Sequence, residues 1–322
     1  MPKSIQEHQL PNIVGDGLMR NLSIDGQADC EVPCEVIKAK ALRRKSLRNV
    51  CVFSLCYFLT FSGFWALTNL QSTMNAEGGL GDYSQAVMYV TAMVSSLFLP
   101  KVLIDKFGCR RILIFGNVVC CFSIASNMFL RWDLMLTASV AFGLANGPFA
   151  SAQTVYIDEM ATRFQSTITE NLEFIMAAFF GMLTFSIENT QVWGNIISFY
   201  VLKNENSSYA GNLSMPSECG ANFFPSENDT NQNLDPPTEY QRFLLIGIYL
   251  GMGLLSVLIM VFFLEPLNND IKAGSGWKTI LERLVSALKF LRNPHPCLLV
   301  PLGIYIGMEG SFYANEVTQL SI

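Results

Sequence analysis

Charged and histidine side chains are scarce in this 322-residue sequence. Only 15% of the residues are charged, against about 25% in soluble domains. The two histidines, His8 and His295, both lie outside the apolar runs, which leaves little basis for histidine-based zinc, catalytic-triad or proton-relay chemistry. The net charge of −5 is small, and we therefore expect no nucleic-acid partner.

The common catalytic and metal-binding motifs are also missing from the sequence. It contains no G-x-S-x-G, H-E-x-x-H or P-loop string. Its nine cysteines are scattered and form no C-x-x-C pair, so a metal or redox centre has little support. We therefore expect no enzymatic activity and no cofactor.

Apolar side chains, in contrast, are abundant. Hydrophobic residues make up 51% of the chain, and 24 residues are Phe. Seven apolar runs are about as long as a helix that crosses a bilayer, which needs about 20 residues; they cover residues 50–70, 83–104, 112–130, 134–157, 174–202, 243–264 and 297–320. Because backbone polar groups in lipid need internal partners, these runs predict helices and an all-α polytopic membrane protein.

A polar segment, residues 203–242, separates the fifth and sixth runs. It contains three N-glycosylation sequons, at Asn206, Asn212 and Asn228, and several prolines. A single sequon arises often by chance, but three in one segment indicate an exposed loop on the lumenal or outer side. A fourth sequon, at Asn21, is expected to stay unmodified because the orientation below places it inside.

The distribution of Lys and Arg gives an independent orientation. Six basic residues lie between Lys38 and Arg48, before the first run, and none lies in 71–82. Five more lie in 265–296, after the sixth run. The positive-inside rule then places the N-terminus in the cytoplasm and 203–242 outside, in agreement with the sequons. We expect the plasma membrane, with endosomal and endoplasmic reticulum membranes as alternatives.

These patterns divide the chain into four parts. Residues 1–46 are expected to form a disordered cytoplasmic tail, and 47–264 a bundle of six spans with the glycosylated outer loop. Residues 265–296 form a cytoplasmic linker, in which apolar residues at i, i+3, i+4 spacing predict an amphipathic helix. Residues 297–322 form a seventh span, within which the chain ends.

The turn after the second run contains a partial sequence motif. Asp105, Gly108 and Arg110 match positions of the D-R-x-G-R-R loop signature of the major facilitator superfamily, whereas Cys109 replaces a basic position. Such a loop can bridge neighbouring helix ends and hold one closed state as a latch. A plain positive-inside turn explains the same residues equally well.

The fifth run is unusually polar at its centre, where Glu188, Asn189, Gln191, Trp193 and Asn195 lie within eight positions. A carboxylate at the bilayer centre costs roughly 2.5–3.5 kcal/mol on insertion scales. We interpret these residues as an intramembrane polar site that binds a cation or proton, or contacts another membrane protein. The alternative is the hydrated outer end of a tilted helix.

Several strings, in order on successive runs, resemble one family. They are S-L-R-N-V at 46–50, L-T-N-L-Q at 67–71, S-A-Q-T-V-Y at 151–156, V-W-G-N-I-I-S at 192–198, L-L-I-G-I-Y-L-G at 244–251 and R-N-P-H-P-C-L-L-V-P-L-G-I-Y-I-G at 292–307. Together they are similar to the uncoordinated-93 (Unc-93-like) ion-channel regulatory family, a divergent branch of the major facilitator superfamily. The resemblance covers about residues 46–312. It implies two six-helix bundles and a regulatory or trafficking role toward an ion channel, in particular a potassium channel, or a receptor.

The chain ends within what would be the seventh of twelve spans, so we expect it to be the N-terminal part of such a fold. Its expected partners are the lipid membrane and another membrane protein, with a second copy of the chain as an alternative. A secondary transporter of a small solute or ion is the alternative function, and a non-functional truncated form is the third hypothesis.

Overall fold

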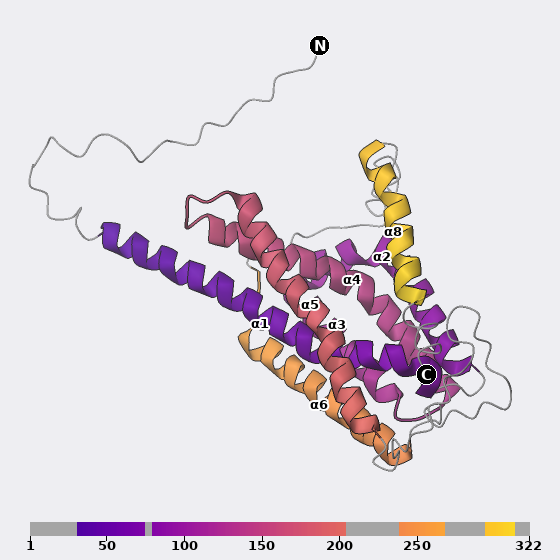
Figure 1. Ribbon diagram of the computed structural model, residues 1–322. Coiled ribbons are helices and arrows are strands. Elements are labelled where there is room, and N and C mark those ends of the chain that lie inside the picture. The colour runs from indigo at the N-terminus through magenta and orange to yellow at the C-terminus, as the bar shows by residue number, and fades with distance from the viewer. Residues whose placement is uncertain (1–30, 75–78, 204–237, 268–293, 313–322) are drawn as a thin grey trace, which may run out of the picture. The chain divides into compact units, whose positions relative to one another are not determined.

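The computed structural model describes residues 31–74, 79–203, 238–267 and 294–312. Within these ranges all regular structure is helical, which confirms the predicted all-α class. The helices, shown in Figure 1, are α1 (Glu31–Met74), α2 (Leu80–Phe107), α3 (Cys109–Ser126), α4 (Trp132–Gln165), α5 (Leu172–Leu202), α6 (Glu239–Phe263) and α8 (Pro294–Phe312).

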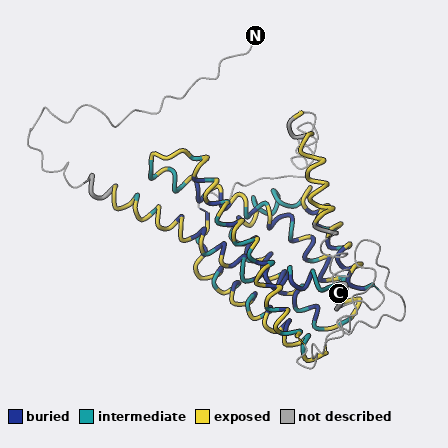
Figure 2. Tube along the Cα trace, in the orientation of Figure 1, coloured by how far each residue is buried: buried dark blue, intermediate teal, exposed yellow. Residues whose placement is uncertain are grey.

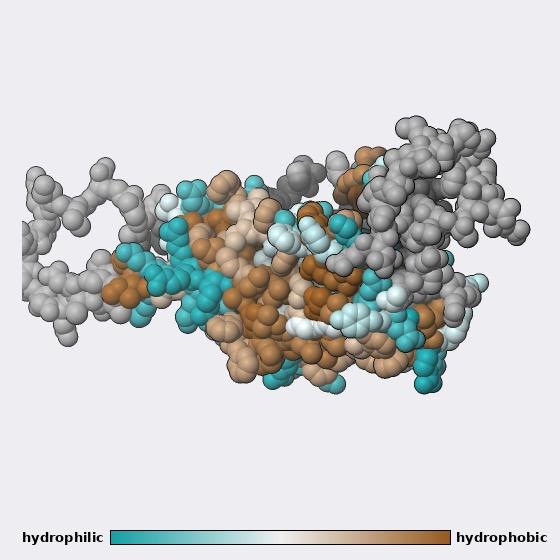
Figure 3. All heavy atoms as spheres, turned by 60° about the horizontal axis from the view of Figure 1, so that its bottom comes forward, coloured by the Kyte–Doolittle hydropathy of each residue, from teal (hydrophilic) through white to brown (hydrophobic). Residues whose placement is uncertain are grey.

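Six of these helices, α1 to α6, are long and apolar enough to cross a membrane. Each coincides with one of the predicted runs, although α3 ends at Ser126, before the end of run 112–130, and α6 ends at Phe263. Their outward side chains are largely apolar, including Phe115, Phe185 and Phe262. Figure 3 shows such side chains covering much of one face. A surface of this kind is stable only when lipid or protein covers it. The prediction of a polytopic membrane protein is confirmed.

The seventh predicted span coincides in part with α8. Its apolar stretch, Cys297–Glu309, is shorter than the other six, and its described side chains are exposed, as the yellow trace in Figure 2 shows. Residues 313–320 of that predicted span lie outside the described part of the chain.

The first helix begins earlier than the sequence suggested. Residues 1–46 were expected to form a disordered tail, but α1 already starts at Glu31. The stretch from Glu35 to Arg48 is rich in Ala, Leu, Lys and Arg, which are good helix formers. Adding such residues to an existing helix avoids the cost of nucleation. At 1.5 Å per residue, α1 is about 66 Å long, which is roughly twice the hydrocarbon thickness.

The part of α1 from Leu42 onward packs together with α2 to α6, and α1 contributes much of the core of this bundle. The Phe53 ring lies 6.1 Å from that of Tyr156 on α4, and Phe61 lies 5.6 Å from Phe149 on the same helix. These aromatic residues are almost completely buried. Figure 2 shows the buried, dark blue stretches gathered where the helices face one another.

Glycine permits the closest helix contacts. A Cβ on Gly63 of α1 would lie 2.5 Å from the Tyr249 Cβ of α6, and one on Gly143 of α4 would lie 2.6 Å from the Met88 carbonyl oxygen of α2. Only a residue without a side chain allows these approaches, as at other small-residue interfaces between membrane helices.

Candidate functional site: the polar face of α5 and its groove

The helix α5 carries all five residues of the predicted intramembrane site. Successive residues of an α-helix point about 100° apart, so these five side chains do not share one face. Gln191 points toward α1, where its Oε1 accepts a hydrogen bond of 2.9 Å from Asn69 Nδ2. Asn189 and Trp193 line a groove, whereas Glu188 and Asn195 are exposed.

A close crossing holds the outer half of α5 against the bundle. A Cβ on Gly194 would lie only 2.4 Å from the carbonyl oxygen of Ser62 on α1. From α6, the Tyr249 hydroxyl donates to the Gly194 carbonyl at 2.7 Å and lies 2.8 Å from Ser198 Oγ. The crossing therefore ties α5 to both α1 and α6.

Beside this crossing, a groove of about 860 Å³ opens between α1 and α5. Among the described residues, those that line it come from these two helices: Cys51, Ser54, Leu55, Phe58, Gly181, Met182, Phe185, Ser186, Asn189 and Trp193. The α1 wall was missed by the sequence reasoning. Its residues, 51, 54, 55 and 58, have the spacing of one helix face, but nothing in that pattern distinguishes a groove wall from a lipid-facing stripe.

The groove contains polar groups as well as apolar ones. Ser186 Oγ donates to the Met182 carbonyl at 3.2 Å, and Asn189 Nδ2 donates to the Phe185 carbonyl at 2.8 Å. Ser54 is only 5% exposed, yet its Oγ has no hydrogen-bond partner among the described residues. A buried hydroxyl without a partner is costly.

Glu188 lies near the middle of α5 and is exposed on its surface. No cation among the described residues forms an ion pair with it. An ionisable group at this depth normally faces a bundle interior, a wet cavity or a partner. Because Glu188 is exposed on the described bundle, the group that satisfies it comes from outside these helices, as water, another part of the protein or a partner.

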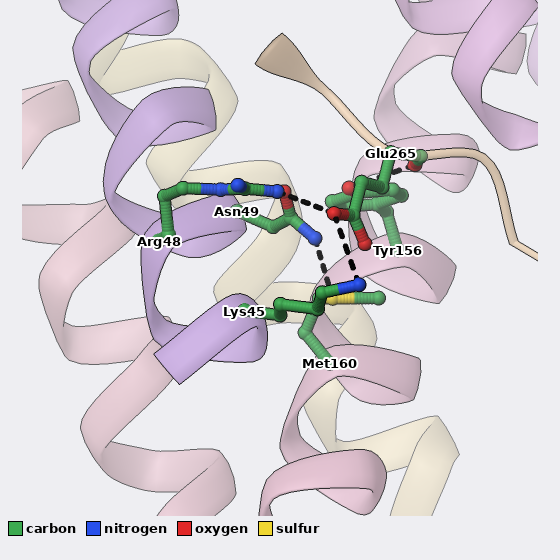
Figure 4. A network of polar contacts seen from close by, with 6 residues as sticks. All are labelled: Lys45, Arg48, Asn49, Tyr156, Met160 and Glu265. Atoms are coloured by element: carbon green, nitrogen blue, oxygen red, sulfur yellow. Dashed lines mark hydrogen bonds and ion pairs between the residues drawn. The ribbon is translucent and has the colours of Figure 1, made fainter. Parts of the chain in front are cut away.

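A second polar cluster, which the sequence reasoning missed, joins one end of α6 to α1 and α4 (Figure 4). It consists of Lys45, Arg48, Asn49, Tyr156, Met160 and Glu265. Arg48 Nη2 donates to Glu265 Oε1 at 2.5 Å, and Lys45 Nζ lies 4.0 Å from the same oxygen. The Tyr156 hydroxyl donates to the Glu265 carbonyl at 3.1 Å. In the sequence, Glu265 is a single acidic residue directly after an apolar run. This position does not indicate that its partners lie on α1 and α4.

The predicted latch residues lie close together but make separate contacts. Asp105 Oδ2 pairs with Lys101 Nζ at 3.3 Å, one turn earlier on α2. Arg110 Nη2 instead donates to the carbonyl oxygen of Val261, at the end of α6. Gly108 separates α2 from α3 with φ 79° and ψ 154°, a backbone conformation that essentially only glycine adopts. Arg110 thus caps a free carbonyl at the α6 terminus.

Other predicted features lie outside the described residues. These are the sequons at Asn206, Asn212 and Asn228 and the amphipathic helix of the 265–296 linker. In the described ranges, no group of three His, Cys, Asp or Glu side chains is close enough to hold a metal ion.

Comparison with known proteins identifies the family. The sequence matches the family described as ion channel regulatory protein UNC-93 over residues 73–316. It is 29% identical to protein unc-93 homolog A of Xenopus laevis over 283 residues, which cover 85% of this chain and 61% of that protein. The Bos taurus homolog A is 31% identical over 286 residues, with the same coverage.

A Caenorhabditis elegans relative, unc-93, has a name that describes it as a candidate potassium channel regulatory protein. It is 30% identical over 292 residues, which cover 88% of this chain and 41% of that protein. The chain thus spans about three fifths of the length of its vertebrate relatives. On the family match and these relatives together, the chain belongs to the ion channel regulatory protein UNC-93 family.

Proposed function

We propose that this chain is a regulatory or trafficking subunit of an ion channel, in particular a potassium channel, or of a receptor. The observation that carries the proposal is membership of the UNC-93 family, together with the name of the Caenorhabditis elegans relative. Because the chain spans about three fifths of its vertebrate relatives, the activity of the whole protein is part of the proposal.

Two features of the structure support a role in binding another membrane protein. A pocket between α1, α2, α3 and α4 measures only about 20 Å³, which is room for about one water molecule. By contrast, the exposed Glu188 and the groove lie on the outside of the bundle. An ionisable group at membrane depth marks a functional site that needs a partner group, and we take this outward surface as the one that contacts another membrane protein.

The proposal includes a cytoplasmic N-terminus and location in the plasma membrane. The basic residues of α1 between Lys38 and Arg48 support this orientation. The three sequons of the loop before α6 support an outer position for that loop.

The direct test is removal of the chain from cells that express it. Whole-cell potassium current and the number of channels at the surface are measured before removal, after removal and after re-expression. We expect the current or the surface number to change on removal and to return on re-expression. Unchanged current and unchanged surface number of every potassium channel tested would refute the proposal for this partner class, leaving receptors to be tested by their surface level.

A secondary transporter is the second candidate, favoured by the size of the groove. Its volume of about 860 Å³ lies within the range of small-molecule pockets, and Glu188 supplies a charge nearby. Flux of small ions and solutes into vesicles that contain the purified chain tests this function. Flux that disappears in Glu188→Gln would support transport, whereas no flux over a broad solute panel would eliminate it.

A further inference from the structure

We propose that the groove between α1 and α5 is the docking site for a membrane-spanning helix of a partner protein, and that this helix places a lysine or arginine side chain against Glu188. The inference rests on the proposed function, which requires a membrane-protein partner. It adds the surface that receives the partner and the chemistry that the partner presents.

The shape of the groove fits a helix. Its two walls are stripes at helical spacing, with residues 51, 54, 55 and 58 on α1 and 182, 185, 186, 189 and 193 on α5. Small side chains recur along both walls, at Cys51, Ser54 and Ser186, and a Cβ on Gly181 would meet nothing within 4 Å. Small residues allow the backbone of a third helix to approach closely, as at other interfaces between membrane helices.

The polar groups of the groove favour an occupant with hydrogen-bonding side chains. Asn189 lines the groove, and its Nδ2 donates to the Phe185 carbonyl at 2.8 Å. An amide side chain has a second N–H group and an oxygen that accepts. A lipid acyl chain offers these groups no partner, whereas a helix with a polar side chain at the matching depth does, because such side chains hydrogen-bond across membrane helix pairs.

The charge of Glu188 identifies the matching side chain. Glu188 is not itself one of the lining residues, but it follows Phe185 and Gly181, which are, by three and seven residues. Helical spacing therefore places it beside this edge of the groove. No described cation pairs with its exposed carboxylate. A lysine or arginine would neutralise the carboxylate at membrane depth. A second copy docked face to face would bring two Glu188 side chains together, and like charges disfavour that arrangement.

A synthetic transmembrane peptide tests the proposal on the full chain. The probe is a leucine-rich helix with one central lysine and one cysteine about two turns away; the matched probe has leucine in place of lysine. Cys51 is exposed in the groove and provides a native thiol for disulfide cross-linking. The chain is reconstituted in phosphatidylcholine vesicles and oxidised with copper–phenanthroline, and mass spectrometry identifies the cysteine that reacts. Cys297→Ser removes the other exposed described thiol.

We expect about tenfold more cross-linking to Cys51 with the lysine probe than with the leucine probe. Both probes are compared on the wild-type chain, so this comparison needs no mutant. In Glu188→Gln this preference should disappear. Glu173→Gln, which removes an exposed carboxylate at the start of the same helix, should keep it.

Equal yields from the two probes, an unchanged preference in Glu188→Gln, or predominant Cys51–Cys51 linkage between two copies of the chain would each overturn the proposal. These outcomes are distinct from failure of the proposed function. If removal of the chain alters potassium current while the two probes cross-link equally, the docking surface alone is wrong.

Discussion

Replacement of Gly194 by alanine should weaken the packing of α5 on α1. A Cβ at this position would lie 2.4 Å from the Ser62 carbonyl oxygen and 3.0 Å from the Ala66 Cβ. Ordinary contacts begin near 3.4 Å, and both neighbours belong to α1, whose backbone cannot yield locally. The α5 helix must therefore move outward by about 1 Å, an overpacking strain of the kind that costs about 1–3 kcal/mol.

The same movement would strain two hydrogen bonds across the crossing. They are the 2.9 Å bond from Asn69 to Gln191 and the 2.7 Å bond from Tyr249 to the Gly194 carbonyl. Each such bond in a membrane protein contributes about 0.6 kcal/mol. Alanine regains roughly 0.5–1 kcal/mol because it favours the helix more than glycine does. The net loss of stability should be about 1–3 kcal/mol.

Unfolding of the purified chain in mixed micelles by titration with sodium dodecyl sulfate measures this loss. The matched control is Gly251→Ala on α6, where a Cβ meets nothing within 4 Å; this variant should be as stable as the wild type or slightly more stable. If Gly194→Ala unfolds at the same detergent fraction as Gly251→Ala, the close crossing of α1 and α5 is refuted.

Three further results follow from the same structure. Gly108→Ala should destabilise the chain by about 1–3 kcal/mol in the same titration, because alanine is strained at φ 79° and ψ 154°; equal stability would contradict the turn geometry. Glu265→Gln and Arg48→Ala should each cost about 0.5–1 kcal/mol, a modest value because the two side chains are 35% and 46% exposed. The double variant should cost less than the sum of the two single ones, and strict additivity would show that the pair does not interact. The three sequons between α5 and α6 are at Asn206, Asn212 and Asn228. Their removal one at a time should lower the mass of the protein on a gel stepwise, until the triple variant no longer responds to peptide-N-glycosidase. Loss of the Asn21 sequon should leave the mass unchanged, and a shift there would contradict the proposed orientation.

The membrane helices were predictable from the sequence because they depend on a one-dimensional property. A run of about 20 apolar residues must form a helix in lipid whatever surrounds it, and the six long spans lie where those runs lie. The start of α1 was not predictable in this way, because a polar stretch has no apolar signal. Its helical form depends on the propensity of its residues and on the span that follows it.

The arrangement of the polar residues was less predictable, because it depends on helix rotation and on distant partners. The sequence placed Glu188, Gln191 and Asn195 in one site, but the rotation of α5 directs Gln191 to Asn69 and leaves the other two exposed. Glu265 was missed for a similar reason. Its partner Arg48 lies 217 residues away in the chain, so only the packed bundle brings them together.

The proposal that α5 engages a membrane partner is tested most directly by rescue of potassium current in cells from which the chain has been removed. Wild type, Glu188→Gln and Glu173→Gln are re-expressed at equal membrane levels, and whole-cell current is recorded. We predict that wild type and Glu173→Gln restore the current and that Glu188→Gln does not. Full restoration by Glu188→Gln would contradict the account.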